Sequence, residues 1–98
     1  MLEIELTAAG TVTVGGRLDA LEAPKAQTFL DAVDGDCLLD LSNLEYVSSA
    51  GLGVLLKTHK RLAGAGGGLR LVNVRSHIFD IFSYSGFDKL FEITRAAD

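Results

Sequence analysis

Several features of extracellular and membrane proteins are scarce in this sequence of 98 residues. It contains one cysteine, Cys37, which excludes an internal disulfide and favours a reducing compartment. The apolar run 52–56 is far shorter than the roughly 20 residues that a membrane-spanning helix needs. No basic segment followed by an apolar stretch opens the chain, so no signal peptide is expected. These absences predict a cytoplasmic protein without membrane insertion.

Charge is also moderate. Thirteen acidic residues against nine basic ones give a net charge of -4 at pH 7. An acidic protein of this kind offers no positively charged surface for binding a phosphate backbone, so no nucleic-acid partner is expected. With 48% hydrophobic residues the composition is that of a globular protein, and the length suits a single domain over residues 1–98.

Motifs for catalysis or metal binding are missing as well. The sequence has no histidine and cysteine cluster at metal-ligand spacing. The glycine-rich segment 64–68 follows a predicted helix and precedes a predicted strand, which is the reverse of a phosphate-binding loop. His59 is expected to be a satisfied, partly buried histidine, and His77 a surface residue. We therefore expect a protein that is not an enzyme, with no cofactor, no metal site and no catalytic residue.

The hydrophobic pattern switches between strand and helix periodicity. Alternation over Leu2–Leu6 and Thr11–Leu18, around a turn at Gly10, predicts an antiparallel hairpin. Pro24 fits the first turn of a helix whose apolar stripe extends to Val33. Further on we expect a strand buried on both faces at 37–41, a loop at 42–47 and a second helix at 50–63. A strand at 69–74 precedes a third helix at 76–84, with Ser76 as its N-cap and Gly86 as the glycine just past its end. A short strand at 91–93 and a frayed segment at 94–98 follow. The order predicts an α/β fold with a mixed sheet opened by the N-terminal hairpin.

The segment 48–53, at the start of the second predicted helix, departs from ordinary helix sequence. A serine before a helix commonly caps it, but Gly51 and Gly53 each cost roughly 0.8–1 kcal/mol relative to alanine inside a helix. Two interpretations remain open. Either the first turn packs tightly on the sheet, or the helix N-terminus is kept free of bulky side chains so that another molecule can approach Ser49.

A phosphoryl group on Ser49 would be compatible with this position. The helix dipole and the free N–H groups of the first turn tolerate an added charge of about -1.5 to -2. Val54, Thr58 and Arg61, with Lys57 beside them, lie opposite the inner apolar stripe of the helix. This second stripe is expected to be exposed, as a docking face or as ordinary solvated helix surface.

The order of these motifs resembles the STAS domain of bacterial anti-sigma factor antagonists. The resemblance rests on the segments 16–19, 40–55 and 85–93 and covers nearly the whole chain. It implies that Ser49 is phosphorylated, with Asp19, Ser48 and Gly51 near the phosphorylation site. Ser48 stands where the family typically has aspartate and is the alternative acceptor. The implied partner-binding residues lie on the second helix: Gly53, Val54, Lys57, Thr58 and Arg61.

The resemblance implies a protein-binding switch. Unphosphorylated protein would bind a serine-kinase anti-sigma factor and free the sigma factor, and a metal-dependent serine phosphatase would reset the switch. A second hypothesis is a constitutive STAS subunit of a larger assembly, in lipid or anion transport or another signalling complex, in which Ser49 is a helix cap and is never modified. A third is a binder of nucleotides or small ligands that uses the turn 48–53 as an anion nest.

Overall fold

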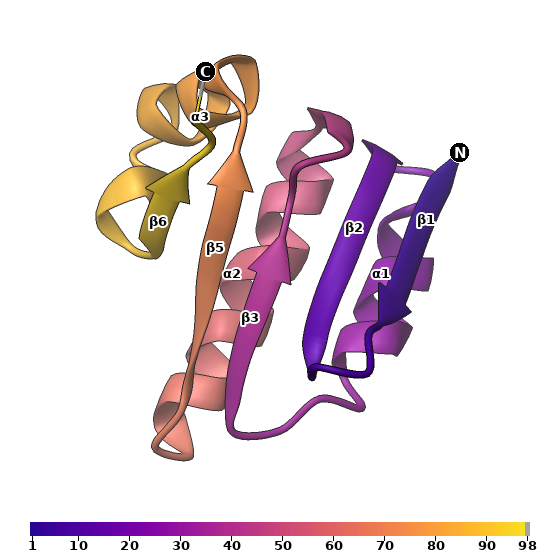
Figure 1. The fold of residues 1–98 in the computed structure, drawn as a ribbon, viewed down its shortest axis with the longest axis vertical. Coiled ribbons are helices and arrows are strands. Elements are labelled where there is room, and N and C mark those ends of the chain that lie inside the picture. The colour runs from indigo at the N-terminus through magenta and orange to yellow at the C-terminus, as the bar shows by residue number, and fades with distance from the viewer. Residues whose placement is uncertain (98) are drawn as a thin grey trace.

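A mixed six-stranded sheet is the framework of the protein, and the computed structural model describes residues 1–97. Five strands follow one path across the sheet (Figure 1): β1 (Leu2–Leu6), β2 (Thr11–Leu18), β3 (Asp36–Asp40), β5 (Gly68–Val74) and β6 (Glu92–Arg95). The sixth, β4 (Leu44–Val47), pairs with β2 off this path. The helices are α1 (Ala23–Leu30), α2 (Ser49–Gly64), α3 (Ser76–Tyr84) and the short 3-10 helix η1 (Phe87–Lys89). The predicted α/β class and mixed sheet are confirmed.

The N-terminal hairpin forms as predicted. β1 pairs with β2 in antiparallel register from Leu2 opposite Gly16 to Leu6 opposite Val12, and all other pairings in the sheet are parallel. Gly16 has a φ of +82°, and a side chain there would collide with the Met1 carbonyl. Glycine is required at this position because the two backbones approach closely.

The predicted loop 42–47 is wrong, because residues 44–47 form β4. This strand runs parallel to the second half of β2, from Gly16 opposite Leu44 to Leu18 opposite Val47. The register shifts between Gly16 and Arg17, so the buried residues Leu44 and Val47 are three positions apart. A strand this short, without strict alternation, carries no period-2 signal.

Helices α1 and α2 cover one face of the sheet and leave the opposite face open (Figure 1). The core lies between these layers and contains Val12, Leu39, Leu55 and Leu71. The prediction that strand 37–41 is buried on both faces is therefore wrong. Cys37 and Leu39 are buried towards the helices, whereas Leu38, which points to the open face, is only half-buried.

Several helix and strand boundaries differ from the prediction, most of them by one or two residues. α1 carries Pro24 in its first turn as expected but ends at Leu30. The N-cap of α3 is Arg75 rather than Ser76, while Gly86, with a φ of +78°, ends the helix region as predicted. β6 continues to Arg95, so residues 94 and 95 are ordered in the sheet, and the expectation for Asp98 lies outside the described residues. Within residues 1–97, no helix is long and apolar enough to cross a membrane.

Candidate functional site

The segment 48–53 leaves the sheet where β2 and β4 end together. Leu18 and Val47 are the last paired residues, and the Ser48 N–H donates to the Leu18 carbonyl at 2.9 Å. From this edge the chain turns into α1 after β2 and into α2 after β4. Asp19 and Ser48 each follow the last residue of their strand, so the pairing brings these two predicted site residues to the same edge of the sheet.

The two serines at the start of α2 have different structural roles. Ser48 is the N-cap, since its backbone is extended and its Oγ accepts a hydrogen bond from the Gly51 N–H at 3.2 Å. Ser48 is half-buried, whereas Ser49 is the first helical residue and is exposed. The hydroxyl of Ser49 is therefore accessible, and the cap does not depend on it.

The two glycines of the first turns also differ. A Cβ on Gly51 would lie 2.5 Å from the Leu18 carbonyl oxygen and 2.9 Å from Cγ2 of Val47, so the helix packs on the sheet at this point. A Cβ on Gly53 would meet nothing within 4 Å, and Gly53 is exposed. Tight packing explains Gly51, and nothing inside residues 1–97 explains Gly53.

Asp19 supports the turn into α1. Its Oδ1 accepts the Glu22 N–H at 3.0 Å, and its Oδ2 lies 3.8 Å from Nε of Arg17. The Arg17 guanidinium stacks on the Tyr46 ring at 4.5 Å from the ring centre, a cation–π contact across paired strands. Sequence reasoning missed the Arg17–Tyr46 pair because Tyr46 was assigned to a loop.

The predicted docking stripe on α2 is largely buried, which corrects the expectation that it is exposed. Val54 is 7% exposed and Thr58 is 1% exposed, and the Thr58 hydroxyl donates to the Val54 carbonyl at 2.8 Å. Arg61 donates from Nη2 to the carbonyls of Leu30 (2.9 Å) and Val33 (2.6 Å), at the end of α1. This side of α2 therefore faces α1.

The exposed side of α2 carries a different set of residues. Of the predicted partner-binding residues, Gly53 and Lys57 lie there, and Lys60, which sequence reasoning did not select, lies on the same side one turn further. Arg61 is exposed in part, but its guanidinium is bound to α1 and lies 3.3 Å from Asp34. We call Ser49, Gly53, Lys57 and Lys60 the exposed strip of α2.

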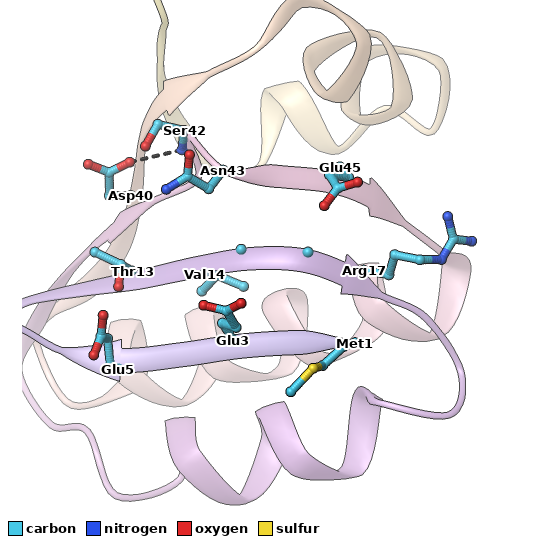
Figure 2. Close-up of a pocket in the computed structure, with 12 residues that line it drawn as sticks. Met1, Glu3, Glu5, Thr13, Val14, Arg17, Asp40, Ser42, Asn43 and Glu45 are labelled. Carbon is cyan, nitrogen blue, oxygen red and sulfur yellow. Dashed lines mark hydrogen bonds between the residues drawn. The ribbon is translucent and has the colours of Figure 1, made fainter.

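A hollow of about 470 Å³ lies on the open face of the sheet (Figure 2). Carboxylates from three strands line it: Glu3, Glu5, Asp40 and Glu45. Partial burial alone would raise the pKa of Asp40, but hydrogen bonds from the backbone and side chain of Ser42 and from Asn73 together lower it. Among the described residues, no group of three or more His, Cys, Asp and Glu side chains is placed so that it could hold a metal ion.

The two histidines and Cys37 lie in surroundings that fit structural or surface residues. His59 Nδ1 accepts the Leu69 N–H at 3.1 Å, and its ring packs edge-on against Phe91, which confirms the expected satisfied histidine. His77 is exposed, as predicted. Burial raises the pKa of the Cys37 thiol, which keeps the thiol protonated and unreactive.

The mixed sheet, and the capped helix that leaves its edge with an exposed serine, define a small α/β domain of the STAS type. A family model described as "Mlab, STAS domain" matches residues 4–93. The chain is 35% identical over 80 residues to BtrV of Bordetella bronchiseptica, whose name assigns it to the anti-sigma factor antagonists, covering 82% of this chain and 68% of that protein. This protein belongs to the STAS domain family.

Solved structures show the same fold. An anti-sigma factor antagonist from Mycobacterium paratuberculosis is 26% identical, with a TM-score of 0.78 over 96% of this chain and 84% of that one. The Bacillus cell fate determinant SpoIIAA in its phosphorylated form is 20% identical, with a TM-score of 0.68 over 95% of this chain and 90% of that one. At 20% identity, SpoIIAA supports the fold assignment alone.

Proposed function

We propose that this protein is an anti-sigma factor antagonist that binds a serine-kinase anti-sigma factor through the exposed strip of α2. Phosphorylation of Ser49 by that kinase ends the binding, and a metal-dependent serine phosphatase restores it. We assign this switch, and the protein with it, to the cytoplasm. The names of its relatives support the class of function. The observation that carries the proposal is the exposed Ser49 hydroxyl one turn before the open surface at Gly53.

Ser49 suits modification better than Ser48. The Ser48 oxygen is used to cap the Gly51 N–H and is half-buried, so a phosphoryl group there would disturb the packed first turn. A phosphate on Ser49 would lie in solvent at the positive end of the α2 dipole. The fold should therefore tolerate phosphorylation of Ser49.

A bound partner would tolerate it less. A phosphate at an interface is desolvated and faces the partner surface at close range, which weakens binding without unfolding either protein. A cost of about 4 kcal/mol is enough to raise the Kd about a thousandfold. This difference between free and bound states is all that the switch requires.

Affinity capture from lysate of the source organism tests the proposal. The baits are the native protein, Ser49→Ala, Ser49→Glu and, as a control for the cap, Ser48→Ala. We expect a serine-kinase anti-sigma factor on all baits except Ser49→Glu. Ser48→Ala should lower the free energy of unfolding by about 1 kcal/mol, because only Ser48 is the cap. Equal capture of the same proteins by every bait would contradict the switch and favour a constitutive subunit.

A kinase assay identifies the acceptor. The captured kinase, purified and supplied with ATP and Mg²⁺, should phosphorylate the native protein and Ser48→Ala but leave Ser49→Ala unmodified. Mass spectrometry of the modified peptide checks this directly. Phosphate on Ser48 in the native protein would overturn the assignment to Ser49.

A further inference from the structure

The charge of α2 differs from that of the rest of the protein. Thirteen of the 98 residues are acidic, yet none of the 16 residues in α2 is. Helix N-termini favour Asp and Glu in the first turn because of the macrodipole, and α2 lacks them there too. The helix that bears Ser49 thus presents cations only, on a chain with a net charge of -4.

Two of the three Lys and Arg residues of α2 are available to a partner. Arg61 is bound to the carbonyls at the end of α1 and to Asp34. Lys57 and Lys60 are exposed and form no ion pair within residues 1–97. Both lie on the exposed strip, on the same side of the helix as Ser49 and Gly53.

The size and charge of the side chains on the exposed strip change along its length. Its first half has small side chains at Ser49 and Gly53, and its second half has the two lysines. At 1.5 Å per residue, Lys57 lies about 12 Å along the helix from Ser49. Side chains on a helix lean towards its N-terminus, which directs the lysines of the strip towards its small half. A partner that covers Ser49 and Gly53 and reaches about 12 Å along the helix would also meet Lys57.

We propose that the surface of the partner that docks on α2 is acidic, and that Lys57 and Lys60 bind its carboxylates. This inference rests on the proposed function and adds the chemistry of the partner. Carboxylates placed opposite the lysines would also lie near a phosphate on Ser49. Like-charge repulsion then adds to desolvation in releasing the phosphorylated protein.

The test is a titration of the purified anti-sigma factor kinase, recovered as described above, with charge-reversed protein. Lys57→Glu/Lys60→Glu is compared with Arg75→Glu/Lys89→Glu, which makes the same change in net charge at exposed residues outside α2. We expect the α2 pair to weaken binding about tenfold or more and the control pair to leave it within about twofold. Thermal unfolding of all variants verifies that each is folded.

Salt dependence supplies a second readout. The affinity of the native protein should fall between about 50 and 300 mM NaCl, and Lys57→Gln/Lys60→Gln should remove most of that fall. Equal affinity of the two charge-reversed pairs, or tighter binding by the α2 pair, would overturn the inference. The proposed switch would still stand in that case if Ser49→Glu fails to bind the kinase. Failure of the native protein to bind the kinase would overturn the proposed function, and this inference with it.

Discussion

The two sides of the first turns of α2 differ in how closely they are packed. On one side Gly51 lies against Leu18 and Val47 with no room for a methyl group. On the other side Gly53 faces open space. The sequence presents the two glycines as one unusual feature with two competing explanations. The structure assigns tight packing to Gly51 and shows no packing reason for Gly53 within residues 1–97.

The same division continues along the helix. Val54, Thr58 and Arg61 lie on the side towards α1, where the first two are buried and the third binds the end of that helix. Lys57 and Lys60 lie on the open side. Stability should therefore depend on one side of α2 and partner binding on the other, and substitutions on each side test this separation.

Gly51→Ala should have the largest effect. Its methyl group would lie 2.5 Å from the Leu18 carbonyl oxygen, a backbone atom that cannot move without disturbing β2. We expect the free energy of unfolding to fall by about 3 kcal/mol and the Tm by more than about 10 °C, measured by denaturant and thermal unfolding. A Tm equal to that of the native protein would show that the packed side of the turn is not tight.

Arg61→Ala should have the next largest effect. It removes a partly buried hydrogen bond to the Leu30 carbonyl and an exposed one to the Val33 carbonyl, so it should cost about 1–2 kcal/mol. Lys57→Ala is the matched control and should change stability by less than about 0.5 kcal/mol. Equal losses from the two variants in urea unfolding would abolish the distinction between the sides of α2.

Sequence reasoning could predict much of the fold because period-2 alternation, the single proline and the turn glycines are local signals. The hairpin, α1 and the end of α3 at Gly86 follow from such signals. β4 does not, since its four residues pair with β2 across a register shift. The open face of the sheet was also missed, because a run such as Cys37–Leu39 is apolar whether or not a second helix layer covers it.

The candidate site was predictable in position but not in orientation. A serine pair before a helix indicates a cap, yet only the backbone at Ser48 and its bond to Gly51 show which serine is used. The apolar stripes of α2 likewise predict one buried side, and the arrival of α1 against a second side buries Val54 and Thr58. Tertiary contacts of this kind have no signal in the helix's own sequence.

Gly53→Ala should change stability less than Gly51→Ala or Arg61→Ala, and in the opposite direction. Alanine is favoured over glycine in a helix by roughly 0.8–1 kcal/mol, and the added methyl group meets nothing within 4 Å, so the free protein should become more stable. If a partner approaches the helix at Gly53, the same methyl group should weaken binding of the captured kinase. Under the docking hypothesis this one variant should therefore gain stability in unfolding experiments and lose affinity in the titration. A gain in stability with unchanged affinity would place the interface elsewhere.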